Sequence, residues 1–172
     1  GLQDSSLAIA LVQMAAGSTV STFDLCVKDS GVPRDQIHIT SKVWPEAEGR
    51  WQSDAYNMVL EHVKASVEKL GTHADLYLIH WPVNPEQRVD YWLALEEAQK
   101  QGSGKSIGVS NFDAAQLEAL METATIQPAV NQVEAHPLYP NAELAAYCAK
   151  EGIVLQAYAA LGGQDAGKAK WE

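Results

Sequence analysis

Metal-binding signatures are missing from this sequence. Its two cysteines, Cys26 and Cys148, are far apart, and no Cys-x-x-Cys or His-x-x-His spacing occurs. A zinc site therefore has little support, because structural zinc sites are built from such closely spaced pairs. We interpret the cysteines as two unpaired thiols of a reducing compartment, with a disulfide or a reactive thiol as the alternatives.

Signatures of membrane insertion, secretion and nucleic-acid binding are also missing. The longest apolar run, residues 7–16, is interrupted by Gln13 and falls far short of the ~20 residues that a membrane helix needs. The first basic residue is Lys28, so no basic segment precedes that run as it would in a secretory signal. The formal net charge of −10 disfavours nucleic acid and anionic membrane surfaces as partners.

The length and composition of the chain fit one globular domain. The chain has 172 residues, of which 47% are hydrophobic, enough to bury a core and too many for a disordered chain. It is shorter than the roughly 250 residues of a complete (β/α)₈ barrel. The chain begins with Gly1 rather than Met, and we expect an upstream part to be missing.

From residue 37 onward, short apolar segments alternate with longer segments of helical spacing. The apolar segments show no in/out alternation, which is typical of strands covered on both faces. Five strands are predicted, at residues 37–43, 76–79, 106–109, 129–133 and 153–157. Repeated strand–helix order predicts an α/β fold with parallel strands and right-handed crossovers.

Capping residues delimit the predicted helices between these strands. Ser53 is expected to cap the first helix and Gly71 to end it. Residues 113–116, Asp-Ala-Ala-Gln, read as a capping box. Asn141 is expected to cap the last helix and Gly152 to end it.

The two ends of the chain follow neither pattern clearly. Residues 1–29 are expected to form a divergent N-terminal segment, in which residues 19–26 are the plausible strand. Residues 162–172 contain several glycines and polar residues and are expected to form a flexible tail.

Polar or aromatic side chains follow each of the five predicted strands. Parallel α/β folds place their chemistry at the carboxyl ends of strands, so we expect these side chains to meet at one mouth. They are Lys42, His80, Ser110 with Asn111, Gln132 with Glu134, and Tyr158. Three strand ends are followed by proline, which cannot donate to a sheet ladder, in Trp44-Pro45, Trp81-Pro82 and His136-Pro137.

This set of side chains suits work on a carbonyl group. Lys42 and His80 can polarise or protonate a carbonyl oxygen, and the Ser, Asn and Gln side chains can hold a planar carboxamide. Tyr158 can stack on a flat ring, while Trp44 and Trp81 can line an apolar pocket. Each residue taken alone also has a structural interpretation, as a snorkelling lysine, a core histidine or a packed aromatic ring.

Five segments in order resemble the third to seventh barrel strands of the aldo-keto reductase family. They are residues 30–45, Ser-Gly-Val-Pro-Arg-Asp-Gln-Ile-His-Ile-Thr-Ser-Lys-Val-Trp-Pro; 75–82, Asp-Leu-Tyr-Leu-Ile-His-Trp-Pro; 104–112, Gly-Lys-Ser-Ile-Gly-Val-Ser-Asn-Phe; 128–137, Pro-Ala-Val-Asn-Gln-Val-Glu-Ala-His-Pro; and 154–158, Val-Leu-Gln-Ala-Tyr. The resemblance implies an incomplete TIM-type (β/α)₈ barrel with parallel strands. It implies one truncated NADP-dependent oxidoreductase domain over residues 1–172.

The same resemblance implies NADPH-dependent reduction of aldehydes and ketones to alcohols by a cytoplasmic enzyme with small carbonyl substrates. In the family, hydride passes from the nicotinamide to the carbonyl carbon, and a tyrosine whose pKa is lowered by a lysine and an aspartate supplies the proton. The residues that match by motif are Lys42 and His80 as catalytic residues, Ser110, Asn111, Gln132 and Tyr158 as cofactor-binding residues, and Trp44 and Trp81 in the substrate pocket. No metal is implied.

Three departures from the family pattern bear on activity. The family tyrosine follows its aspartate by five residues, but Asp29 stands five residues after Asp24, and the first tyrosine is Tyr56. Residues 159–162 read Ala-Ala-Leu-Gly instead of Ser-Pro-Leu-Gly. The eighth strand and the basic segment that holds the adenosine phosphate have no counterpart.

These departures predict impaired carbonyl reduction. The alternatives are a non-catalytic nicotinamide-binding or regulatory relative, or a barrel fragment that assembles with another chain. Missing barrel strands would leave the first and last predicted strands with open edges, unless the first 30 residues cover one of them. Open apolar edges predict self-association.

Overall fold

A parallel sheet organises the described part of the molecule. The computed structural model describes residues 8–11, 29–44 and 54–162, which contain six strands arranged in the sheet in their chain order. The strands are β1 (Ala8–Leu11), β2 (Ile37–Val43), β3 (Ala74–Ile79), β4 (Gly104–Ser110), β5 (Val130–Glu134) and β6 (Val154–Tyr158). Every neighbouring pair is parallel, so the carboxyl ends of all six strands lie along one edge of the sheet.

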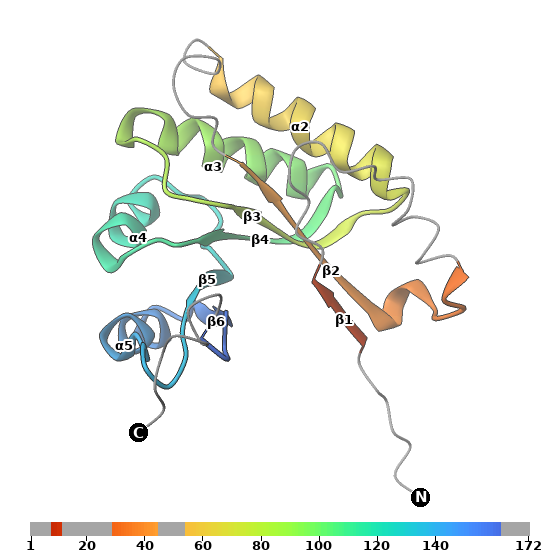
Figure 1. Ribbon diagram of the computed structural model, residues 1–172. Helices are drawn as coiled ribbons and strands as arrows, with labels where there is room; N and C mark the ends of the chain where they lie inside the picture. The colour runs from red at the N-terminus through yellow and green to blue at the C-terminus, as the bar shows by residue number, and fades with distance from the viewer. Residues whose placement is uncertain (1–7, 12–28, 45–53, 163–172) are drawn as a thin grey trace, which may run out of the picture.

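Helices connect the strands and cover one side of the sheet. A short 3-10 helix, η1 (Arg34–Gln36), precedes β2. The helices are α2 (Ala55–Leu70), α3 (Pro85–Lys100), α4 (Ala114–Met121) and α5 (Ala142–Lys150). Figure 1 shows them in sequence along the outer side of a curved sheet, which is the arrangement of half a (β/α)₈ barrel.

The predicted α/β fold with five parallel strands in chain order is confirmed. β2 occupies its predicted range, and the limits of the other four strands differ from prediction by one or two residues. The sixth strand, β1, was not predicted. It lies inside the segment expected to be divergent and pairs with β2, so the β2 edge is covered, which is the alternative that the prediction of open edges allowed for the first 30 residues. Residues 19–26 and 163–172 lie outside the described residues.

Three predicted helix boundaries are confirmed: Gly71, the capping box of residues 113–116, and Gly152, which follows α5 with a left-handed backbone. The predicted cap at Ser53 is wrong, and Asn141 lies at its predicted position without making the capping bond. Gly71 ends α2 in the left-handed conformation, and Asp113 with Gln116 forms the capping box of α4. The cap of α2 is Asp54 rather than Ser53, and its side chain accepts a hydrogen bond from the backbone N–H of Asn57. Asn141 occupies the cap position of α5 but does not bond to the helix, because its Nδ2 donates to the carbonyl oxygen of Glu134 at 2.6 Å.

Burial along the sheet decreases toward β6. All six residues of β3 are buried, as expected for a central strand covered on both faces. β6 was expected to be covered in the same way, but Val154 is 62% exposed and Ala157 is also exposed. The reason is that β6 is the last strand of the described sheet, where β5 pairs with one of its sides and no described strand pairs with the other.

β4 and β5 approach each other closely at Gly108. A Cβ atom at this position would lie 2.4 Å from the carbonyl oxygen of Val130 and 2.9 Å from a methyl carbon of Leu78. A larger residue would therefore push β4 away from β5, which explains why a glycine stands in the middle of a buried strand.

The carboxylate of Asp75 joins the amino ends of three neighbouring segments. Its Oδ2 accepts hydrogen bonds of 2.8 Å from the backbone N–H of Ile39 in β2 and from Arg34 in η1, while its Oδ1 lies 2.9 Å from the Lys105 ammonium in β4. Burial alone raises the pKa of Asp75, but the hydrogen bonds from Ile39, Lys105 and Arg34 outweigh it and hold the pKa at about 2, below its ordinary 3.8.

We expect Asp75→Asn to lower the free energy of unfolding at pH 7 by about 2 kcal/mol, because the folded state binds the Asp75 carboxylate better than the unfolded state does. Since the folded pKa is the lower one, this contribution is complete above about pH 4 and disappears as the pH falls toward 2. Urea unfolding at pH 7 and pH 3 measures both effects.

The matched control for this experiment is Asp90→Asn, which changes an exposed carboxylate on α3. It should leave the free energy of unfolding within about 0.5 kcal/mol of wild type. A difference between wild type and Asp75→Asn that did not shrink between pH 7 and pH 3 would contradict the proposed role of the carboxylate.

Candidate active site

Residues from the carboxyl ends of five strands line one cavity. Its volume is about 450 Å³, and its walls are Lys42, Trp44, His80, Trp81, Asn111, Gln132, Tyr158 and Ala159. Every residue predicted for a catalytic site, a cofactor site or a substrate pocket lines this cavity, except Ser110. The parallel pairing explains this convergence, because side chains that follow parallel strands emerge at the same edge of the sheet.

His80 is held between two tryptophans near the lysine. Its ring centre lies 4.4 Å from that of Trp44 in an edge-on contact and 6.4 Å from that of Trp81 in a stacked one, and the residue is 9% exposed. Burial and, to a smaller extent, the charge of Lys42 lower the pKa of His80 from 6.5 to about 4. The imidazole is therefore neutral at pH 7 and suited to hydrogen bonding rather than to donating a proton as a cation.

Lys42 shares this low-polarity environment. Burial lowers the pKa of its ammonium group from the ordinary 10.5. Lys42 is the second-last residue of β2 and lies opposite Leu78 of β3, which places it next to the strand that His80 follows.

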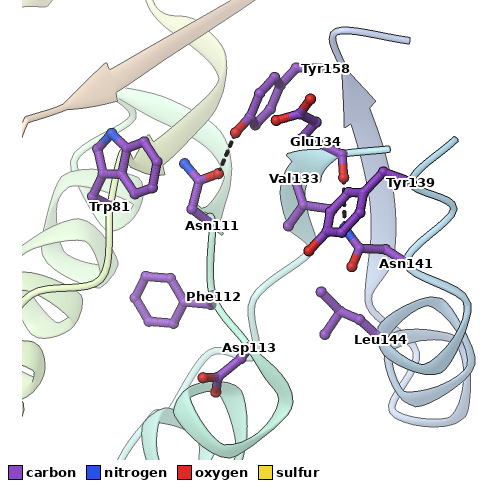
Figure 2. Close-up of a pocket in the computed structure, with 10 residues that line it drawn as sticks. All are labelled: Trp81, Asn111, Phe112, Asp113, Val133, Glu134, Tyr139, Asn141, Leu144 and Tyr158. Carbon is purple, nitrogen blue, oxygen red and sulfur yellow. Dashed lines mark hydrogen bonds between the residues drawn. The ribbon is translucent and has the colours of Figure 1, made fainter. Parts of the chain in front are cut away.

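Asn111 joins the ends of several strands. It has a left-handed backbone with φ of 64°, and its Nδ2 donates to the carbonyl oxygen of His80 at 2.9 Å and to Ser110 Oγ at 3.1 Å. Its Oδ1 accepts a hydrogen bond of 2.8 Å from the hydroxyl of Tyr158, which Figure 2 shows as a dashed line. Its backbone N–H donates to the carbonyl oxygen of Gln132 at 2.9 Å.

Ser110 is behind the cavity wall rather than on it. The residue is fully buried, and its hydroxyl donates to the carbonyl oxygen of Gln132 at 2.7 Å. This bond ties β4 to β5 and uses the hydroxyl proton. Among the residues predicted to hold a carboxamide, Asn111 and Gln132 are therefore the two that line the cavity.

The side-chain amide of Gln132 is buried, and one of its two polar atoms has no described hydrogen-bond partner. The residue is 1% exposed, and its Nε2 donates to Gln156 Oε1 at 2.8 Å. No described residue donates to its Oε1. Gln156 was not recognised from the sequence, because it lies within a strand and its place opposite Gln132 follows only from the register of β5 and β6.

A second cavity of about 310 Å³ adjoins the first and shares Trp81, Asn111 and Tyr158 with it. Its other walls come from β5, from α5 and from the segments that follow β4 and β5 (Figure 2): Phe112, Asp113, Val133, Glu134, Tyr139, Asn141 and Leu144. Glu134, predicted as a strand-end residue, belongs to this cavity, where its carboxylate lies 3.1 Å from His136 Nε2.

Metal and membrane signatures remain missing in the described ranges. No group of three or more His, Cys, Asp or Glu side chains there is placed to hold a metal ion. No described helix is long and apolar enough to cross a membrane. Cys148 is a buried free thiol, and burial raises its pKa; Cys26 lies outside the described residues.

Comparison with known proteins gives one consistent result. The Aldo/keto reductase family profile matches residues 15–170. Glyoxal reductase of Bacillus subtilis (strain 168) is 45% identical over 136 residues, which cover 78% of this chain and 47% of that protein. The 9,11-endoperoxide prostaglandin H2 reductase of Trypanosoma cruzi (strain CL Brener) is 40% identical over 143 residues, covering 82% and 48%. The chain thus spans about half the length of these relatives.

Solved structures agree with the sequence matches. An aldo-keto reductase from a Medee basin deep-sea metagenome library superposes with a TM-score of 0.86 at 35% identity, over 98% of this chain and 60% of the other. A Bombyx mori aldo-keto reductase in complex with NADP superposes with a TM-score of 0.70 at 30% identity, over 81% and 48%.

The environment of His80 leads to a direct test. NMR titration should give a pKa near 4 for His80 in the wild-type chain. In Lys42→Met the pKa should rise, because the repelling charge is removed, but it should stay below 6.5 because burial, the larger cause, remains. Lys64→Met, which removes an exposed charge on α2, is the control and should leave the value unchanged. A wild-type pKa at 6.5 would disprove this description of the site.

Proposed function

The chain belongs to the aldo/keto reductase family, and from this membership we propose that it carries part of an active site for the NADPH-dependent reduction of aldehydes and ketones to alcohols. The observation that carries the proposal is the convergence of Lys42, His80, Asn111, Gln132 and Tyr158 on one cavity. The chain spans about half the length of its relatives. Carbonyl reduction, which is an activity of a whole protein, is therefore proposed for this chain.

Two side chains would act on the substrate carbonyl. His80 is neutral at pH 7 and would hydrogen-bond to the carbonyl oxygen, while the Lys42 ammonium would stabilise the negative charge that develops there. Trp44 and Trp81 flank His80 and would give the substrate apolar walls. A small carbonyl compound is therefore the proposed substrate class.

The cofactor proposal rests on the amide groups of the cavity. The free Oε1 of Gln132 is a buried acceptor that suits a ligand with an N–H donor, such as a primary carboxamide. Gln132 and Asn111 would hold the nicotinamide carboxamide, and the Tyr158 ring would stack against the nicotinamide. When bound, the dinucleotide supplies the hydride. A Bombyx mori relative solved in complex with NADP supports this choice.

The proton donor is where this chain departs from its family. The family pattern expects a tyrosine where this sequence has Asp29. The ionisable residues that line the cavity are Lys42, His80 and Tyr158. Burial and the nearby Glu134 carboxylate raise the pKa of Tyr158, and its hydroxyl proton is already donated to Asn111. We propose that none of these groups replaces a dedicated acid efficiently.

We expect the 172-residue chain to reduce a reactive aromatic aldehyde with NADPH about a thousandfold more slowly than the Bacillus subtilis glyoxal reductase, because general acid catalysis contributes ~10²–10⁴-fold. The loss of NADPH absorbance measures the rate. Turnover within tenfold of that relative, abolished by His80→Ala, would refute the expectation and identify His80 as the acid.

A binding measurement separates the cofactor proposal from the rate. Gln132→Leu should weaken NADP⁺ binding by about tenfold or more, since it removes a buried hydrogen-bonding group. Gln101→Leu is the matched control, because Gln101 is exposed and lies after α3, at the opposite end of the sheet from the cavity. Equal NADP⁺ affinity in the two variants would remove the main support for the cofactor proposal.

We also propose that this chain associates with a second copy through β6. The strand pairs with β5 on one side among the described residues, and Val154 on it is 62% exposed. An apolar strand with an open edge is a ready template for pairing with another chain.

Sedimentation velocity should show oligomers of the wild-type chain at micromolar concentration. Val154→Lys should weaken association by at least about tenfold, because an edge lysine opposes strand pairing. Leu93→Lys removes a partly exposed leucine on α3 instead and should not change association. A single sharp monomer boundary for the wild type, together with a cooperative melt, would exclude this mode of assembly.

A further inference from the structure

The second cavity has no part in the proposed function, although it lies beside the first. Trp81, Asn111 and Tyr158 are walls of both cavities, whereas Lys42 and His80 line the first alone. A molecule that placed its carbonyl group beside Lys42 and His80, and was longer than the first cavity, would extend past the shared walls into the second. The chemistry of the second cavity then decides which molecules fit.

Aromatic side chains form a large part of the wall of this second cavity. They are Trp81, Phe112, Tyr139 and Tyr158, and Figure 2 shows them on different sides of a common space. Trp81 is 44% exposed and Tyr139 is 54% exposed, so both rings are accessible to a ligand. The face of an aromatic ring attracts a cation that lies within about 6 Å of the ring centre.

The charged groups of the same wall are carboxylates. Asp113 and Glu134 line the cavity, and no lysine or arginine of the described residues does so. Asp113 Oδ1 accepts the capping hydrogen bond of α4 from the backbone N–H of Gln116. The Glu134 side chain is 43% exposed and lies beside the Tyr158 ring, where burial and the Glu134 charge raise the pKa of the Tyr158 hydroxyl. A carboxylate beside aromatic rings favours a positively charged ligand.

The segment between β5 and α5 holds these groups in place. The backbone N–H of Tyr139 donates to the carbonyl oxygen of His136 at 2.8 Å, and the reverse bond is 3.1 Å long. His136 Nε2 also lies 3.1 Å from Glu134 Oε1, although His136 itself does not line the cavity. Asn141 Nδ2 donates to the carbonyl oxygen of Glu134. A ligand therefore meets groups that are already ordered, which lowers the entropic cost of binding.

We propose that the second cavity binds a positively charged nitrogen, and that the substrates of this site are aldehydes that carry such a group at the far end of a short chain. The carbonyl half of this inference rests on the proposed function. The charged nitrogen lies between the Tyr139 ring and the Glu134 carboxylate, whereas a carboxylate in its place is repelled by Glu134. The net charge of −10 acts in the same direction, because it attracts cationic molecules to the protein.

Three alcohols of similar length separate the effect of charge from that of size. They are 5-amino-1-pentanol, the neutral 1,5-pentanediol and the anionic 6-hydroxyhexanoate. Each is titrated into the 172-residue chain by NMR, without a dinucleotide. The amino alcohol should bind at least about tenfold more tightly than the diol, and the hydroxy acid should bind more weakly than the diol. Higher salt should reduce both differences, because it screens the charges.

Two residues report on the two cavities separately. Trp44 lines the first and not the second, and Tyr139 lines the second and not the first. n-Butylammonium should shift the signal of the Tyr139 backbone N–H and leave the Trp44 indole N–H unchanged. The amino alcohol should shift both signals, because its hydroxyl group takes the place of the carbonyl oxygen in the first cavity. A shift of Tyr139 alone by the amino alcohol would overturn the link between the cavities and with it the substrate class.

Substitutions test the two groups assigned to the charged nitrogen. Glu134→Gln removes the charge at nearly constant size and should reduce the preference for the amino alcohol over the diol about tenfold. Tyr139→Phe retains the ring and should keep the preference, whereas Tyr139→Leu should lower it about threefold. Glu143→Gln is the matched control, because it removes the same charge from an exposed residue in the first turn of α5 that does not line the cavity.

The control should behave as the wild type does. Equal affinities of the wild type for the amino alcohol and the diol, or equal effects of Glu134→Gln and Glu143→Gln, would overturn the cation subsite.

Reduction rates distinguish failure of this inference from failure of the proposed function. With NADPH, a trimethylammonio aldehyde of the same length, which cannot cyclise, should be reduced at least about tenfold faster than hexanal at the same low concentration. If both aldehydes are reduced at the same rate, the inference is wrong and the proposed function stands. If neither is reduced, the proposed function fails and with it the substrate class, while the binding measurements still decide the cation subsite.

Discussion

The side-chain amide of Asn111 connects strand ends that the sheet alone leaves separate. Its Nδ2 donates to the carbonyl oxygen of His80 after β3, and its Oδ1 accepts the hydroxyl proton of Tyr158 at the end of β6. Its backbone N–H bonds to Gln132 at the end of β5. Asn111, which has a left-handed backbone, thus serves two strand ends through its side chain and a third through its backbone N–H. The shape of the cavity follows from these bonds, since they fix three of its walls relative to each other.

The two ends of the sheet are held by different chemistry. At the amino ends, the Asp75 carboxylate is compensated by Arg34 and Lys105 and has a lowered pKa, which is the behaviour of a structural ion pair. At the carboxyl ends the bonds that Asn111 makes with His80 and Tyr158 are between neutral groups, and burial lowers the pKa values of Lys42 and His80. Ionisable groups whose pKa is shifted by burial in a cavity are typical of functional sites, whereas a charge held in a network of ion pairs, as at Asp75, stabilises the fold.

Much of the fold and of the site was predictable, because the positions and the parallel order of the strands determine both. Continuous apolar segments marked the strands, and parallel order implied that Lys42, His80 and Tyr158 would meet. What could not be predicted depends on tertiary partners. Asn141 resembles a helix cap until the Glu134 carbonyl oxygen is near its amide. The hydrogen bond between Gln132 and Gln156 depends on the register of β5 and β6, which no local sequence pattern encodes.

The join between β4 and β5 is the shortest ladder in the described sheet, with two registered pairs, Val109 with Asn131 and Ser110 with Gln132. Bonds outside the ladder supplement it, from Ser110 Oγ and the Asn111 backbone N–H to the carbonyl oxygen of Gln132, and from Asn131 Nδ2 to the carbonyl oxygen of Phe112. Asn111 stands on one side of this join and Gln132 on the other. A molecule held by both would add contacts across this join, so occupancy of the cavity would make local separation of β4 from β5 less frequent.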